Sequence, residues 1–586
     1  MQPLDFTTLT AVCQELRQAW LPARLEQVFQ RDRFTLYLAL RTLQGRCWLL
    51  ISWHPQAARL HISEAPPKQP DTFTFSQQIW HQFSGLALVD LCLLSPWERV
   101  VDLQFARRPG DESLGHLYVE IMGQYSNVIL VNSQQEIISA AHQVSRQQSS
   151  LRPIQTGDRY EAPPSQTQIS PSLEESFQRW HDRLTLVPDR LRKALLSTYR
   201  GLSSALVTEW LQAAGLDWEI RTEAIALPQW QVLFQQWQTW LQQLADGTFQ
   251  PSFTGQGYLV LGKASPPQLS DRLEPTLTVQ QLLDRYYGDH LNQQEFAQLR
   301  HQLQQRVQAC LTKLRTKRDG FLERLTASDR ADLYRQQADL LMAHLQDWQV
   351  GMNSIQLTDF ETGQLLTIPL SPEKNAVQNA QGLYKQHQKL KRAKDAIAPL
   401  LQAVQSEITY LEQVATALQQ IDHYQTQADL GAIGEIREEL IQQGYCSDPF
   451  SSAKPRKGVL PSSPASQPIR FQTPSGFELL IGRNNRQNDH LTFRTASDYD
   501  LWFHTQEIPG SHSLLRIPAG SVADEADLQF TADLTAYYSQ ARQSEQVPVI
   551  YTQPKWVFKP KGSPPGTVIY RQETVIWGNP QRAQIQ

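Results

Sequence analysis

The stretch Leu303–Phe321, LQQRVQACLTKLRTKRDGF, combines an apolar stripe with a run of basic side chains. Its apolar residues follow the heptad spacing of one face of a long helix. They are Leu303, Val307, Cys310, Leu314 and Phe321. A second stripe alternates by fours and threes, at Ile397, Leu401, Val404, Ile408, Leu411, Ala415 and Leu418. Two such stripes in one chain predict a long antiparallel coiled coil over residues 285–443.

Two features interrupt this helical region. Pro399 falls inside the second stripe, so it should kink that helix or mark its true start. Between the stripes, residues 354–370, SIQLTDFETGQLLTIPL, predict a β-hairpin on a Thr-Gly turn. We therefore expect a small middle domain, over about residues 340–383, at the tip of the coiled coil.

The residues before the coiled coil predict two further domains. Residues 1–168 begin with an amphipathic helical pattern and continue with strand-like runs such as FTLYLALR, CWLLISWH and NVILVNS, which indicates an α+β domain built largely from antiparallel strands. Residues 169–250 are helical, and residues 191–216 predict two helices that are joined by a turn at Gly201 and closed by Gly215. Such a helix-hairpin-helix can direct backbone N–H groups at a phosphate, or it can be a plain helical spacer.

The C-terminal part of the chain follows a segment rich in proline and serine. Residues 444–468 predict a flexible linker, and residues 469–586 a β-rich α+β domain. Within that domain, Tyr499–Arg516, YDLWFHTQEIPGSHSLLR, predicts a hairpin on a Pro-Gly turn. It would place His504 and His512 on neighbouring strands. No third metal ligand stands nearby, so Ser511 and His512 are expected to hold the turn or to donate to a phosphate.

The composition limits the possible functions. The 586 residues carry a net charge of -4 and a pI near 6.4, so any surface that binds nucleic acid must be local. Five widely spaced cysteines without a C-x-x-C pair predict neither a zinc site nor a disulfide framework. The N-terminus lacks the pattern of a signal peptide, and no window resembles a membrane span. We expect a cytoplasmic protein without a metal or cofactor.

Basic residues gather on both predicted helical arms. The two clusters are Lys313, Arg315, Lys317 and Arg318, and Lys385, Lys389, Lys391, Arg392 and Lys394. No acidic residue occurs from 301 to 318, so the first cluster lacks interleaved acids that would form helix-supporting pairs. The clusters are either solvated helix faces or contacts to nucleic-acid phosphates, and we favour phosphate contact.

Several motifs together resemble one known family. Residues 482–492, GRNNRQNDHLT, 500–512, DLWFHTQEIPGSH, 537–544, YYSQARQS, and 559–570, KPKGSPPGTVIY, are similar to the RNA-binding domain of the NFACT family. Residues 116–132, HLYVEIMGQYSNVILVN, and 370–393, LSPEKNAVQNAQGLYKQHQKLKRA, extend the resemblance to the N-terminal domain and the second helical arm. The family includes bacterial ribosome quality-control factors and proteins called fibronectin-binding.

The resemblance implies a role on the large ribosomal subunit. Family members bind subunits that are still blocked by peptidyl-tRNA, contact rRNA and a stalk-base protein, and recruit alanyl-tRNA for template-free alanine addition to the stalled peptide. Because the ribosome forms the peptide bond, no catalytic residue is expected in this chain. Membrane and DNA partners are not expected.

The resemblance also implies which residues make the contacts. The tRNA contacts would be Glu98, Arg99, Glu120, Ile121 and Met122, with glutamate at 98 where the family has aspartate. The rRNA contacts would be the two basic clusters. The C-terminal RNA contacts would be Arg483, Asn484, Asn485, Asn488, Trp502, His504, Ser511 and His512. Without the family, a local surface ion pair is the simpler interpretation of Glu98 and Arg99.

Two other classes of function remain as alternatives. One is a surface fibronectin-binding adhesin, which the missing signal-peptide pattern disfavours. The other is a nucleic-acid-binding protein that resembles DNA glycosylases. Those enzymes also have an α+β domain followed by a helical hairpin. Those enzymes need an N-terminal proline with an adjacent glutamate, whereas this chain begins Met-Gln-Pro-Leu.

Overall fold

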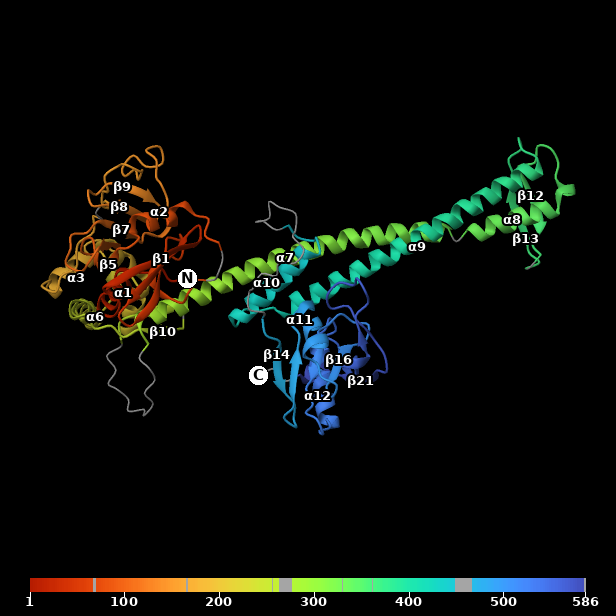
Figure 1. Ribbon diagram of the computed structural model, residues 1–586. Helices are drawn as coiled ribbons and strands as arrows, with labels where there is room; N and C mark the ends of the chain where they lie inside the picture. The colour runs from red at the N-terminus through yellow and green to blue at the C-terminus, as the bar shows by residue number, and fades with distance from the viewer. Residues whose placement is uncertain are drawn as a thin grey trace. The chain divides into compact units, whose positions relative to one another are not determined.

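The computed structural model describes residues 1–66, 70–164, 167–255, 257–262, 277–328, 330–360, 362–447 and 466–583. It is a mixed α+β protein with an N-terminal sheet domain, a long helical region and a C-terminal sheet domain (Figure 1). The chain divides into two compact units, Met1–Leu291 and Asn292–Gln586. The domain limits expected from the sequence stay predictions, and residues 448–465 of the expected linker lie outside the described residues.

The first unit opens with the amphipathic helix that the sequence predicts. Helix α1 (Phe6–Ala19) begins at Asp5, whose Oδ1 accepts a hydrogen bond from the Thr8 N–H at 2.8 Å. The expected apolar face, with Leu9, Val12 and Leu16, is buried. The helix therefore forms where local capping and its apolar period agree.

An antiparallel sheet forms the body of the first unit. Its strands are β1 (Ala23–Asp32), β2 (Thr35–Thr42), β3 (Gly45–Ser52), β4 (Arg59–Ser63), β5 (Ala87–Leu93), β6 (Val100–Ala106), β7 (Gly115–Glu120), β8 (Asn127–Asn132) and β9 (Ile137–Ala140). Among the described residues their order is β4-β3-β2-β1-β5-β6-β7-β8-β9, so most neighbours in space are neighbours in the chain. Helix α2 (Thr74–Phe83) connects β4 to β5.

A helical layer packs against this sheet domain in one continuous core. It contains α3 (Phe177–Thr185), α4 (Leu191–Thr198), α5 (Ser204–Ala213) and α6 (Leu227–Asp246), followed by the short strands β10 (Ser252–Thr254) and β11 (Gly257–Leu259). Tryptophan side chains fill its centre, and the Trp237 and Trp240 rings lie 5.5 Å apart. Trp240 Nε1 donates to Thr7 Oγ1 of α1 at 2.9 Å. The helical hairpin is thus built into the first unit.

Two long helices dominate the second unit. Helix α7 (Val279–Ser328) starts in the first unit and continues into the second, and α9 (Ala376–Gln420) returns. Leu303 and Val307 of α7 share a hydrophobic cluster with Val404, Ile408 and Leu411 of α9. The two predicted stripes therefore face each other over this part of their length.

Pro399 does not mark the start of the second long helix. Helix α9 runs through it from Ala376, because a capping box already fixes the N-terminus. Asn375 Oδ1 accepts from the Gln378 N–H at 2.8 Å, and Gln378 Oε1 accepts from the Asn375 N–H at 3.1 Å. One of the two alternatives for this proline is therefore wrong.

Between these helices lie α8 (Ala331–Ala343) and the hairpin of β12 (Ser354–Thr358) and β13 (Leu365–Pro369). After α9 comes α10 (Gln427–Gln442).

The C-terminal domain is built on a second antiparallel sheet. Among the described residues its strands lie in the order β14 (Ile469–Gln472), β15 (Glu478–Ile481), β17 (Ser513–Leu515), β16 (Leu501–Thr505), β18 (Val547–Thr552) and β21 (Thr574–Gly578). Helices α11 (Asn485–His490) and α12 (Glu525–Tyr537) belong to the same domain. Strands β16 and β17 pair as the hairpin that the sequence predicts. Within the described residues, no helix combines the length and the apolar character needed to span a bilayer.

Candidate nucleic-acid interface

A loop between β5 and β6 carries Glu98 and Arg99, and a tryptophan fixes its conformation. Trp97 has a φ of 65°, a left-handed conformation that tryptophan seldom adopts. Its ring lies 4.9 Å from Phe6 and 5.5 Å from Trp240, centroid to centroid. Gly201 of the helical hairpin approaches the same ring so closely that an added Cβ would stand 2.6 Å from Trp97 Cε3. The loop and the hairpin therefore hold each other in place.

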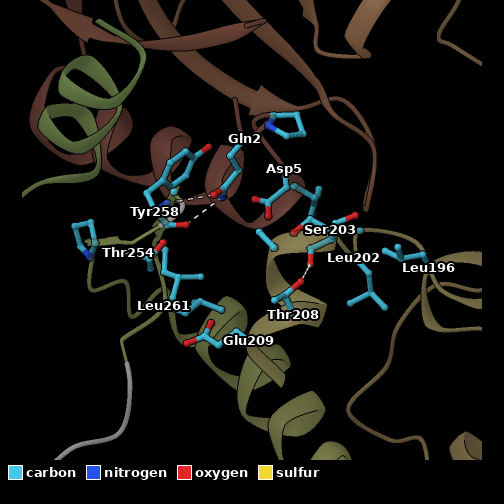
Figure 2. Close-up of a pocket in the computed structure, with 18 of the residues that line it drawn as sticks. Gln2, Asp5, Leu196, Leu202, Ser203, Thr208, Glu209, Thr254, Tyr258 and Leu261 are labelled. Carbon is cyan, nitrogen blue, oxygen red and sulfur yellow. Dashed lines mark hydrogen bonds between the residues drawn. The ribbon is translucent and has the colours of Figure 1, made fainter. Parts of the chain in front are cut away.

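A cavity of about 1360 Å³ opens where these two elements meet (Figure 2). Glu98, Arg99 and Met122 line it from the sheet domain. Figure 2 shows Ser203 and Thr208 from the hairpin side and Thr254, Tyr258 and Leu261 from the segment around β10 and β11. The structure thus brings together three of the five residues that the family resemblance assigns to tRNA.

Glu98 and Arg99 do not form an ion pair with each other in the described structure. The nearest cation to the half-buried Glu98 carboxylate is Arg200, whose Nη1 lies 3.8 Å from Oε1, too far for a hydrogen bond. Arg99 Nη1 donates to the Leu4 carbonyl oxygen at 3.3 Å. Burial lowers the pKa of Arg99, while the charges of Asp5 and Glu98 act in the opposite direction. The simpler interpretation, a local ion pair, is wrong because the two side chains have different partners.

The segment Glu120–Met122 is joined to this loop through the backbone. The Ile121 N–H donates to the Arg99 carbonyl oxygen at 2.9 Å, and Val100 pairs with Glu120 in the sheet. Met122 reaches the cavity, whereas the Ile121 side chain is buried in the core. This segment therefore supports the loop more than it lines the cavity.

Glu120 does not line the cavity. Its side chain is fully buried, and its carboxylate accepts from Arg152 Nη1 at 2.9 Å and from the Tyr160 hydroxyl at 3.0 Å. Burial raises the pKa of Tyr160, which therefore stays protonated as a donor. The carboxylate is satisfied inside the domain, and sequence analysis missed both partners. The sequence did contain a signal for such partners. Glu120 ends an apolar strand, and a charge that is buried there needs a partner.

The charges at the cavity favour hydrogen-bond donors over a free phosphate. The acids Asp5, Glu98 and Glu209 line it, and Arg99 is the only basic side chain among the described lining residues. Ser203 caps α5, since its Oγ accepts from the Leu206 N–H at 3.2 Å. The first N–H groups of a helix have no acceptor within the helix, and here Ser204 and Ala205 line the cavity. The site can therefore bind polar edges, such as those of nucleobases and ribose.

Most of the predicted rRNA contacts are exposed. Lys313, Arg315 and Lys317 lie on the surface of α7, whereas Arg318 is half-buried. Arg315 pairs with Glu412 of α9 at 2.8 Å, and Arg318 pairs with Asp319 at 2.8 Å. The second cluster, Lys385, Lys389, Lys391, Arg392 and Lys394, is exposed on α9. The first cluster is thus partly neutralised by acids, one of them from the facing helix, which its own sequence does not reveal.

The predicted C-terminal contacts are mostly buried. Asn484, Asn485, Asn488, Trp502, Ser511 and His512 are at most 4 % exposed, and Arg483 and His504 are half-buried. The start of this motif joins the domain to helix α10. Asn484 Nδ2 donates to Glu435 at 2.6 Å, Asn485 Nδ2 donates to Glu439 at 3.1 Å, and Arg483 pairs with Asp429.

The remaining members of this set form an internal network. Trp502 Nε1 donates to Thr492 Oγ1 at 3.0 Å, and the same hydroxyl lies 2.8 Å from His512 Nδ1. Ser511 Oγ donates to Gln420 Oε1 of α9 at 3.1 Å. Burial lowers the pKa of His504 to about 4, so this ring is neutral near pH 7. In this structure Trp502, Ser511 and His512 have internal partners and are buried, whereas Nε2 of the half-buried His504 has no hydrogen-bond partner among the described residues.

Comparisons with known proteins cover nearly the whole chain. Two family models match, one for the NFACT N-terminal and middle domains over residues 5–458 and one for the NFACT protein RNA binding domain over residues 467–572. A Streptococcus suis (strain 05ZYH33) protein described as Rqc2 homolog RqcH is 31% identical, over 98% of this chain and 97% of its own. The Bacillus subtilis (strain 168) protein of the same description is 29% identical, over 97% and 96%.

A solved structure, the C-terminal part of the fibronectin/fibrinogen-binding protein from Streptococcus suis, is 32% identical. It covers 49% of this chain and 96% of that chain, with a TM-score of 0.36. The family resemblance drawn from the sequence motifs is confirmed by the two family models and the two relatives.

Proposed function

Because the chain belongs to the NFACT family, we propose that it is a ribosome quality-control factor that binds large ribosomal subunits blocked by peptidyl-tRNA. The observation that carries this proposal is the likeness, over almost the full length of both chains, to proteins described as Rqc2 homolog RqcH. The protein would act in the cytoplasm, where such subunits occur.

The finer part of the proposal is recruitment of alanyl-tRNA for template-free addition of alanine to the stalled peptide. The cavity beside Glu98 and Arg99 supports a tRNA contact, because its acids and helix N–H groups suit the polar edges of nucleotides. The ribosome would supply the peptide-bond chemistry, so the chain acts by binding and positioning and not as an enzyme.

The subunit contact would come from the long helices. The α9 cluster presents five exposed cations, which suits phosphates of rRNA, and a stalk-base protein would be a second partner. Contacts of this kind release counterions from the RNA, so affinity should fall steeply as salt rises.

The test replaces Lys385, Lys389, Lys391, Arg392 and Lys394 together with glutamine. Exposed substitutions change stability by less than about 0.5 kcal/mol each, so the variant should fold. We expect it to sediment with large subunits carrying peptidyl-tRNA much more weakly than wild type, and with a shallower dependence on salt. The readout is co-sedimentation at increasing salt.

A matched control removes the same number of exposed cations from the first unit: Arg24, Arg107, Arg108, Arg146 and Arg179. This control should sediment like wild type. If wild type itself stays at the top of the gradient at low salt with blocked subunits present, the proposed function is wrong. If both variants sediment equally, the α9 cluster is only a solvated face.

A further inference from the structure

A short β-ribbon in the C-terminal domain presents apolar and aromatic side chains to solvent. Strands β19 (Val557–Phe558) and β20 (Ile569–Tyr570) pair so that Phe558 lies opposite Ile569. Val557 is buried, and the Tyr570 ring lies 6.0 Å from Trp502 in the domain interior. Since side chains alternate along a strand, Phe558 and Ile569 face outward, and they are 40% and 53% exposed.

Cations lie beside two aromatic side chains of this region. Arg571 Cζ lies 5.8 Å from the centroid of the Phe558 ring, and Lys555 Nζ lies 5.8 Å from that of Trp556. The Arg571 N–H donates to the Trp556 carbonyl oxygen at 3.1 Å. This hydrogen bond links the residue before β19 to the residue after β20. We define the ribbon surface as Lys555, Trp556, Phe558, Lys561, Ile569 and Arg571.

The cations of the ribbon surface are available for a partner. Lys555, Lys561 and Arg571 are exposed, and none of them forms an ion pair within the described residues 466–583. The neighbouring Lys559 differs, because it pairs with Asp489 and fastens the ribbon to α11. Among the exposed acids, Glu573 lies closest in sequence to these cations. The surface therefore has an excess of positive charge beside the exposed ring of Phe558 and the half-buried ring of Trp556.

We propose that the ribbon surface is an RNA-binding site of the C-terminal domain and that it takes a single-stranded segment. Unpaired bases stack on aromatic side chains, and lysine and arginine neutralise the phosphates that follow the strand. All six residues fall in the part of the chain that matches the RNA binding domain model. The inference rests on the proposed function and moves the RNA contact from the buried motif at 483–512 to an exposed surface.

The test uses the full chain and a fluorescent 20-nucleotide oligouridine, with affinity measured by anisotropy over a salt series. The double variant Lys561→Gln/Arg571→Gln should bind at least about fivefold more weakly, and its log–log salt slope should shrink by roughly 0.7 for each phosphate contact removed. Phe558→Ala should also lose about fivefold or more, because a stacked base loses its platform. Phe558→Tyr keeps the aromatic face and should bind like wild type.

The matched control, Arg470→Gln/Arg582→Gln, removes two exposed arginines of the same domain outside the ribbon surface. It should leave the affinity and the slope unchanged, and melting curves should coincide for all variants. Wild-type binding of oligouridine by the ribbon variants would overturn the inference, as would a wild-type chain that sediments with blocked subunits but binds no oligouridine. Neither result touches the proposed function, which fails only if wild type does not sediment with those subunits.

Discussion

The loop at residues 97–99 and the motif at residues 483–488 were both expected to contact RNA, but their surroundings in the fold differ. Both concentrate charged or amide side chains, and both correspond to family motifs that imply RNA contact. The loop places Glu98 and Arg99 at an open cavity, whereas Asn484 and Asn485 are buried against acids of α10. A dense polar motif therefore marks a site that needs hydrogen-bond partners, and only the fold shows whether these partners are internal.

The first test of this comparison removes a buried side chain from among the predicted C-terminal RNA contacts. Trp502→Ala should destabilise the C-terminal domain by about 3–5 kcal/mol, because a fully buried ring leaves a cavity and the Thr492 hydroxyl loses a donor. Chemical denaturation followed by circular dichroism measures the loss. Trp577→Ala, which removes an exposed ring, is the matched control and should change stability little. If Trp502→Ala is as stable as wild type but binds RNA more weakly, Trp502 acts in RNA binding and not in the core.

The same comparison predicts a different result at the loop. Arg99→Ala should lose a charge-assisted contact worth on the order of 1.5–3 kcal/mol, or roughly tenfold or more in tRNA affinity. Subunit binding through α9 should survive. The measurement is tRNA recovered per large subunit in pull-downs. Arg99→Lys keeps the charge and separates charge from guanidinium geometry, and equal recovery from wild type and Arg99→Ala would give Arg99 a structural role only.

A third prediction uses the buried acid that holds the C-terminal motif on α10. Burial raises the pKa of Glu439 from its ordinary 4.5 to about 7, against the opposing hydrogen bonds from Tyr410 and Asn485. The folded chain keeps this proton up to about pH 7, whereas the unfolded chain releases it near pH 4.5. This group therefore stabilises the fold most below pH 4.5, and its contribution falls as pH rises from 4.5 to about 7.

Glu439→Gln removes that titration. Its unfolding free energy should exceed that of wild type by on the order of 3 kcal/mol at pH 8, and the difference should vanish near pH 4.5. Urea denaturation across this pH range is the measurement. Glu438→Gln, at a more exposed neighbour, serves as the control and should leave the pH dependence unchanged. A pH dependence in Glu439→Gln that matches wild type would contradict the assignment.

Local patterns predicted the elements that local physics determines. Helix α1, the hairpin at Gly201 and the β16–β17 hairpin follow from periodicity, caps and turn residues, and the structure has all three. Sequence analysis missed β1 and β5, which join the two halves of the large sheet. Their burial patterns mix exposed and buried positions, and irregular pairing interrupts both strands, so neither gives a clear period of two.

The parts of the site that sequence analysis missed depend on distant partners. Arg152 reaches Glu120 from 32 positions away, and the acids of α10 stand about 50 positions before the motif that they contact. Gly201 approaches the ring of the left-handed residue Trp97 from a distant part of the chain. No local pattern contains these pairs, because they arise only when the chain folds.

The smallest expected effect concerns Glu98, where the family resemblance implies an aspartate. Glu98→Asp shortens the side chain by one methylene but keeps the charge at the cavity, so tRNA recovery should stay within about twofold of wild type, or roughly 0.4 kcal/mol. Glu98→Ala should lose far more, because it removes the carboxylate charge from the lining of the cavity. If Glu98→Asp and Glu98→Ala lose similar amounts of tRNA, the position of the carboxylate matters as much as its charge. Glu98 would then influence which tRNA is bound. Sequencing the recovered tRNA from wild type, Glu98→Asp and Glu98→Ala distinguishes a change of affinity from a change of specificity.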